Sequence, residues 1–157
     1  MNEIDRLDDQ LRRSFEGEAW HGPSVLELLE DVTPEEAYAH PVPAAHSIWE
    51  LVLHLTGTYG IVLRRLRGDG TQITPSEDWP AVASAAPSEW QDALSSLRRA
   101  YEQLRKAVRG FTPAKLDEPL VPEPPYTAYT QFIGITQHDL YHAGQIAVLK
   151  KALRSAD

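Results

Sequence analysis

The sequence contains no cysteine. This absence excludes a disulfide scaffold, a zinc site made of thiolates and a cysteine nucleophile. A chain of 157 residues can bury roughly two-thirds of the surface that it exposes when unfolded, so folding does not require a disulfide or a metal. We expect one domain that spans residues 1–157.

Long apolar runs are missing as well, because no segment approaches the about 18 apolar residues of a membrane helix. The first six residues carry charge where a signal peptide has its apolar core, so we expect a cytoplasmic protein. Basic residues are in deficit, with 15 Lys and Arg against 23 Asp and Glu and a net charge of -8. This charge has the wrong sign for binding phosphates, so we expect neither nucleic acid nor an anionic membrane as a partner.

Proline is abundant, with 12 residues. Because proline breaks helix interiors, long helices are confined to the windows without it. Four such windows cover residues 1–22, 44–74, 88–112 and 126–157. Each window carries an apolar stripe with the helical period, and no segment alternates long enough to predict a strand. The sequence therefore predicts an all-α four-helix bundle.

Local signals add detail to this bundle. Ser47 and Ser88 are each followed by Glu or Gln three residues later, so both are predicted to begin a long helix with a capping box. Two short helices are expected before the second long helix, one over residues 24–30 and one opened by Thr33. The connection over residues 67–87 is too long for a tight hairpin and predicts a crossover.

Histidine is the strongest remaining metal ligand in this chain, which has six. His138 and His142 lie four residues apart, so both project from one helix face about 6 Å apart along the axis. They share an apolar seam with Ile135 and Leu149. Burying imidazoles there costs free energy unless each finds a partner. A chelated metal ion is one such partner; the alternative is two core histidines bonded to backbone carbonyls or to Tyr and Asp side chains.

His54 is the candidate for a third ligand, because it lies in the most apolar stretch of the second window. Three imidazoles would hold a divalent ion such as zinc or nickel and leave at least one coordination position open, as catalytic sites do. Gly57 and Gly134 lie near the proposed ligands. Glycine there indicates either space for a ligand or the close approach of two helices.

These motifs resemble the DinB/YfiT-like family of bacterial four-helix bundles. The resemblance rests on Ser47, Glu50 and His54 in one helix and on His-Asp-Leu-Tyr-His-Ala-Gly-Gln-Ile over residues 138–146. It implies an antiparallel bundle, commonly a homodimer, with a divalent metal on three histidines. Carried over by motif, the ligands are His54, His138 and His142.

The wider family includes thiol S-transferases and a thiol-dependent isomerase that use low-molecular-weight bacterial thiols. The resemblance therefore implies a metal-dependent thiol transferase, whose open metal position would bind a cosubstrate thiol and favour its thiolate. Because the chain has no cysteine, the sulfur must arrive with that cosubstrate. The rival interpretation is a non-catalytic bundle that binds a metal or a ligand.

Five further residues are candidates for the pocket or for contacts that orient a ligand. Asp139 replaces the glutamate of the H-E-x-x-H zinc-protease motif, which makes a metal-dependent hydrolase the remote alternative. Asp139 is turned about 100° from His138 on a helix, so we expect it to cap, to pair or to orient a ligand without binding the metal itself. The five candidates are Thr58, Asp139, Gln145, His46 and His21.

The last predicted helix also carries apolar residues away from its seam. Ile133, Leu140 and Ala147 occupy such positions and need cover from another surface. This pattern agrees with the homodimer that the family resemblance implies.

Overall fold

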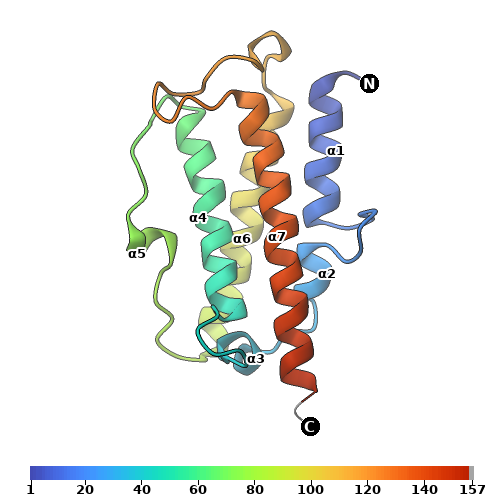
Figure 1. The fold of residues 1–157 in the computed structure, drawn as a ribbon, viewed down its shortest axis with the longest axis vertical. Coiled ribbons are helices and arrows are strands. Elements are labelled where there is room, and N and C mark those ends of the chain that lie inside the picture. The colour runs from blue at the N-terminus through green and yellow to red at the C-terminus, as the bar shows by residue number, and fades with distance from the viewer. Residues whose placement is uncertain (156–157) are drawn as a thin grey trace.

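The computed structural model describes residues 1–155, and these residues form an all-α bundle. Four long helices pack in a closed ring, with α4 on α6, α6 on α1, α1 on α7 and α7 on α4 (Figure 1). The predicted fold class and the four helix windows are confirmed. The long helices are α1 (Glu3–Phe15), α4 (Ile48–Arg65), α6 (Pro87–Arg109) and α7 (Ala128–Arg154).

Short helices occupy the connections. Both short helices expected before α4 are present, and a third lies within the crossover beside α4 (Figure 1). No strand is assigned to residues 1–155, where an isolated bridge joins Pro119 and Thr127. No helix in the described part of the chain is long and apolar enough to cross a membrane. The short helices are α2 (Val25–Leu29), α3 (Pro34–Tyr38) and α5 (Pro75–Asp78), with a 3-10 turn at Pro113–Lys115.

The predicted crossover is confirmed, and its cause is the direction of the helices. Trp49 and Trp90 each lie in the first turns of their helices, α4 and α6, and their ring centroids are 5.2 Å apart. These neighbouring helices therefore run in the same direction, unlike the antiparallel neighbours that the family resemblance implies. The connection must return along the whole bundle, and Figure 1 shows it descending beside α4. Helices α4 and α7 are antiparallel neighbours in the ring. Helix α4 carries His54, and α7 carries His138 and His142.

Capping explains where α4 begins and corrects the prediction for α6. The Ser47 hydroxyl accepts from the Glu50 amide at 3.2 Å, and the Glu50 carboxylate accepts from the Ser47 amide at 2.7 Å. The capping box predicted at Ser88 is wrong, because α6 begins one residue earlier, at Pro87, without a side-chain cap. Proline suits the first helical position, since its missing N–H has no partner to lose there.

The same device begins α5, a helix that the sequence prediction missed. The Thr74 hydroxyl accepts from the Glu77 amide at 3.3 Å, and the Glu77 carboxylate accepts from the Thr74 amide at 2.8 Å. Pro75 follows the cap. The pattern Thr-Pro-x-Glu is a helix-start signal that could have been recognised in the crossover.

The two serines allow a matched test of these caps. We expect Ser47→Ala to lower the free energy of unfolding by about 1 kcal/mol, because an amide at the start of α4 loses its acceptor. Ser88→Ala removes no cap, and we expect a change of about 0.3 kcal/mol or less. Urea denaturation of both variants measures the difference. Equal losses at the two positions would contradict the helix starts described above.

Candidate metal centre

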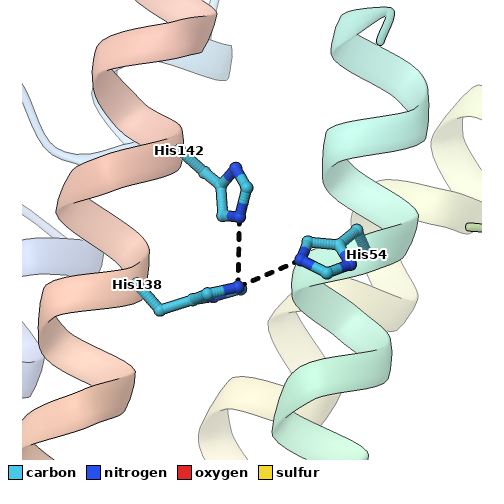
Figure 2. A group of neighbouring side chains, drawn as sticks. All are labelled: His54, His138 and His142. Atoms are coloured by element: carbon cyan, nitrogen blue, oxygen red, sulfur yellow. Dashed lines mark hydrogen bonds between the residues drawn. The ribbon is translucent and has the colours of Figure 1, made fainter. Parts of the chain in front are cut away.

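Three imidazoles converge between α4 and α7. His54 projects from α4, and His138 and His142 project from successive turns of α7 (Figure 2). His138 Nε2 lies 3.0 Å from His54 Nε2 and 3.1 Å from His142 Nε2. One nitrogen of each ring lies within 4.8 Å of the others. The spacing of two histidines on one helix and the third on its neighbour therefore gathers the three predicted ligands at one point.

The outer nitrogens of two rings have acceptors that fix the position of their hydrogens. His54 Nδ1 donates to Asp78, with the backbone oxygen at 3.0 Å and a carboxylate oxygen at 2.9 Å. His142 Nδ1 donates to Gln145 Oε1 at 2.6 Å. In a neutral imidazole one nitrogen carries the hydrogen and the other is an acceptor. Both Nε2 atoms therefore direct a lone pair toward His138.

Hydrogen bonding alone cannot satisfy this arrangement. His138 Nε2 carries at most one hydrogen, so it can donate to one of its two neighbours and leaves at least one pair of nitrogens without a hydrogen between them. Such unpaired contacts are unfavourable in a largely buried cluster. A divalent ion with nitrogen ligands at about 2.1 Å places those nitrogens about 3.0 to 3.4 Å apart. The two separations from His138 lie at this distance, and all three nitrogens lie within 4.8 Å of one another, so the three histidines are a donor set that could hold a metal ion.

The protonation of the cluster also suits a metal. Burial, together with the neighbouring His142 and His54, lowers the pKa of His138 to about 3. Burial lowers the pKa of His142 as well, although its contact with Gln145 acts in the opposite direction. Neutral imidazole is the form that binds metal ions. His138 and His142 are therefore ready to coordinate at neutral pH.

The crossover supplies two residues that sequence reasoning missed. Asp78 holds His54 through Nδ1, and the Trp79 ring stacks on the His54 ring at 4.0 Å between centroids and 2° between planes. His46 stacks on Trp79 at 3.5 Å and 4°. The Thr-Pro-x-Glu pattern was the sequence signal that could have pointed to them, because it predicts α5, and Asp78 and Trp79 lie at the end of that helix.

The other candidates from the sequence have different positions. Gln145 contacts His142 directly, whereas His46 lies beyond Trp79 and lines a groove with Gln145 and Tyr141. The Thr58 hydroxyl donates to the His54 backbone oxygen at 3.0 Å. His21 is exposed and lines a separate groove beside α1, so the structure does not bring it to the centre.

Asp139 does not contact the imidazoles, contrary to the expectation that it orients a ligand. It is fully buried, and its carboxylate accepts from the Tyr59 hydroxyl at 2.7 Å and the Ser14 hydroxyl at 3.1 Å. Burial raises the pKa of Asp139 to about 7, against the two hydrogen bonds, which lower it. The rotation of about 100° between adjacent helix residues turns it toward α1. Asp139 therefore cannot act as the base of the hydrolase interpretation.

A pocket of about 280 Å³ opens beside His138, between α4 and α7. Thr58 and Gly134 line it, and a Cβ built at Gly134 would meet no atom within 4 Å. Gly57 faces the crossover instead, where the Glu77 backbone oxygen lies 3.4 Å from a Cβ built at that position. The structure therefore shows open space at Gly134 and a close approach of the crossover backbone at Gly57.

A four-helix bundle with three imidazoles converging between neighbouring helices defines a class of all-α protein that is equipped to bind a divalent ion. The model of the DinB superfamily matches residues 19–146. The chain belongs to this superfamily, as its motifs predicted. The matched region includes His54, His138 and His142. Comparisons with curated proteins and with solved structures found no match.

Proposed function

We propose that this protein is a metal-dependent thiol S-transferase with a divalent ion, zinc or nickel, on His54, His138 and His142. The observation that carries the proposal is the convergence of three Nε2 atoms that hydrogen bonds among themselves cannot satisfy. Membership of the DinB superfamily supports it, since the family resemblance extends to thiol transferases. Imidazole ligands suit both zinc and nickel.

Two of the three proposed ligands, His54 and His142, have a defined support. Asp78 and Trp79 hold the His54 ring from the crossover, and Gln145 holds the His142 ring from the same helix. His138 is half-buried and forms part of the pocket wall, so a cosubstrate in the pocket reaches the cluster from its side. When bound, a divalent ion with an open coordination position would lower the pKa of a thiol there.

The proposed reaction joins the sulfur of a low-molecular-weight thiol to an electrophilic carbon. A carbon–sulfur bond forms, the bond from that carbon to its leaving group breaks, and the thiol proton is released with the leaving group. The chain supplies no sulfur nucleophile of its own, because it has no cysteine. A reduced small thiol belongs to the cytoplasm, and the proposal places the protein in that compartment.

The metal is tested first. We expect the protein purified without an affinity tag to hold about one equivalent of zinc or nickel, and chelation to lower its melting temperature. Removing the support of one ligand by Gln145→Ala should weaken metal affinity about 10- to 100-fold. Elemental analysis and competition with a chromophoric chelator measure these quantities.

His138→Ala should lose most of the bound metal, whereas Gln137→Ala, at an exposed position of the same helix, is the matched control and should retain it. Substoichiometric metal in the wild type, with a melting temperature unchanged by chelation, would overturn the proposal. The three histidines would then be ordinary core residues.

Turnover is tested separately. With monochlorobimane as the electrophile and glutathione as the thiol probe, we expect a fluorescent thioether and chloride at a rate that chelation abolishes and added zinc or nickel restores. His138→Ala should show only the uncatalysed rate. Cysteine and N-acetylcysteine serve as further thiols. A protein that binds metal and accelerates none of these reactions would be the non-catalytic bundle instead.

A homodimer stays a prediction. Ile133 and Ala147 pack against the core of their own chain, so they need less cover than the sequence pattern implied. The exposed apolar side chains Tyr141 and Val148 lie seven residues apart on one face of α7 and are 66% and 61% exposed. We expect a dimer in sedimentation equilibrium that Val148→Asp dissociates. A wild-type monomer at micromolar concentration would show that this face has no second copy.

A further inference from the structure

The pocket beside His138 is lined by polar side chains at both of its ends. It runs along the groove between α4 and α7 from His138 to Arg65 and Gln131. Because His138 and Gln131 are seven residues apart on one helix, the two ends of the pocket are separated by about 10 Å. The walls between them include Val62 and Ile135. The pocket is therefore apolar along its length and polar at both ends.

Arg65 has no anionic partner in this pocket. The ion pairs formed by residues 1–155 include Arg105 with Asp8 and Arg154 with Glu36, but none that contains Arg65. Its Nη1 donates to Gln131 Oε1 at 3.1 Å, and its Nε is buried without a hydrogen-bond partner among those residues. In a chain with 23 acidic and 15 basic residues, a partly buried guanidinium without a carboxylate needs an explanation.

Gln131 holds the Arg65 side chain in place. Gln131 is 6% exposed, and its Nε2 donates to the Tyr126 backbone oxygen at 3.2 Å. This bond turns Gln131 Oε1 toward Arg65. Burial lowers the pKa of Arg65, as expected for a cation that lacks a compensating charge. A guanidinium remains charged under these conditions, so the end of the pocket presents a fixed positive charge.

We infer that this pocket binds an elongated ligand with a carboxylate on Arg65 and its other end at His138. The inference rests on the proposed function, and it defines the substrate class of that site as a carboxylic acid whose reacting atom lies about 10 Å from the carboxylate. Arginine suits this role, because its planar fork can donate two parallel hydrogen bonds to one carboxylate. Either the thiol cosubstrate or the electrophilic acceptor carries this carboxylate.

Binding of a simple probe tests the carboxylate end without any chemistry. We expect the protein stripped of metal to bind octanoate at least about tenfold more tightly than octanol, because a charge-assisted hydrogen bond forms at Arg65. Arg65→Gln should remove this preference. Arg64→Gln is the matched control, because Arg64 lines a different groove, with Gly57 and Ile73, and it should keep the preference. Isothermal titration calorimetry measures the affinities of the wild type and of both variants for the two ligands.

A second variant tests the pocket itself. Gly134→Leu places a side chain in the open space of the pocket, and leucine favours a helix more than glycine does. We expect this variant to lose octanoate binding without a lower melting temperature. Equal affinity for octanoate and octanol in the wild type, or octanoate binding that survives both Arg65→Gln and Gly134→Leu, would overturn the inference.

The metal-loaded protein separates this inference from the proposed function. There, 8-mercaptooctanoate should bind more tightly than 8-mercaptooctanol, and Arg65→Gln should abolish the difference. Octanoate that competes with the thiol during turnover assigns the carboxylate to the cosubstrate, and competition with the electrophile assigns it to the acceptor. Retained preference for octanoate without any turnover would refute the transferase and keep the carboxylate pocket. Turnover without a preference for octanoate would refute the carboxylate pocket and keep the transferase.

Discussion

Three imidazoles meet at the centre of the bundle, and the nitrogens that face one another include more hydrogen-bond acceptors than donors. The rest of the site is arranged around this imbalance. Two imidazoles donate outward, His54 to Asp78 and His142 to Gln145, so their inner nitrogens face His138 as acceptors. Ordinary core packing would replace such a cluster with leucine, because buried acceptors without donors are destabilising. A cation reverses the sign of this contribution. The same outward bonds that create the imbalance also hold the rings in the orientation that coordination requires.

Sequence patterns predicted the parts of this site that depend on local spacing. His138 and His142 share a helix face by the i, i+4 rule, and the apolar surroundings of His54 placed it inside the bundle. Neither Asp78 nor Trp79 could be assigned in this way, because their contact with His54 joins residues 24 and 25 positions apart through a folded crossover. The contact between Arg65 and Gln131, separated by 66 positions, has no local signature either.

Local sequence rules also gave a wrong helix start where a proline and a capping serine both marked the beginning of the same helix. Ser88 has the sequence of a capping box, but Pro87 before it suits the first helical position and begins α6 one residue earlier. Thr74 and Pro75 carry both signals in the compatible order, with the cap before the proline, and there the helix starts as those signals predict. The order of cap and proline therefore decides where such a helix begins. The direction of α6 relative to α4 is a property of packing that no start signal contains.

Asp139 shows how a residue outside the cluster constrains it. Tyr59 and Ser14 bind its carboxylate from α4 and α1, while His138, the preceding residue, meets His54 of α4. Helix α7 is thus attached to its neighbours by polar contacts on two faces about 100° apart. A rotation of α7 that withdrew the histidines from α4 would also break the buried bonds of Asp139, at a cost of about 1 to 3 kcal/mol for each unsatisfied group. The carboxylate therefore contributes to the proposed metal centre by holding the orientation of the helix that carries His138 and His142.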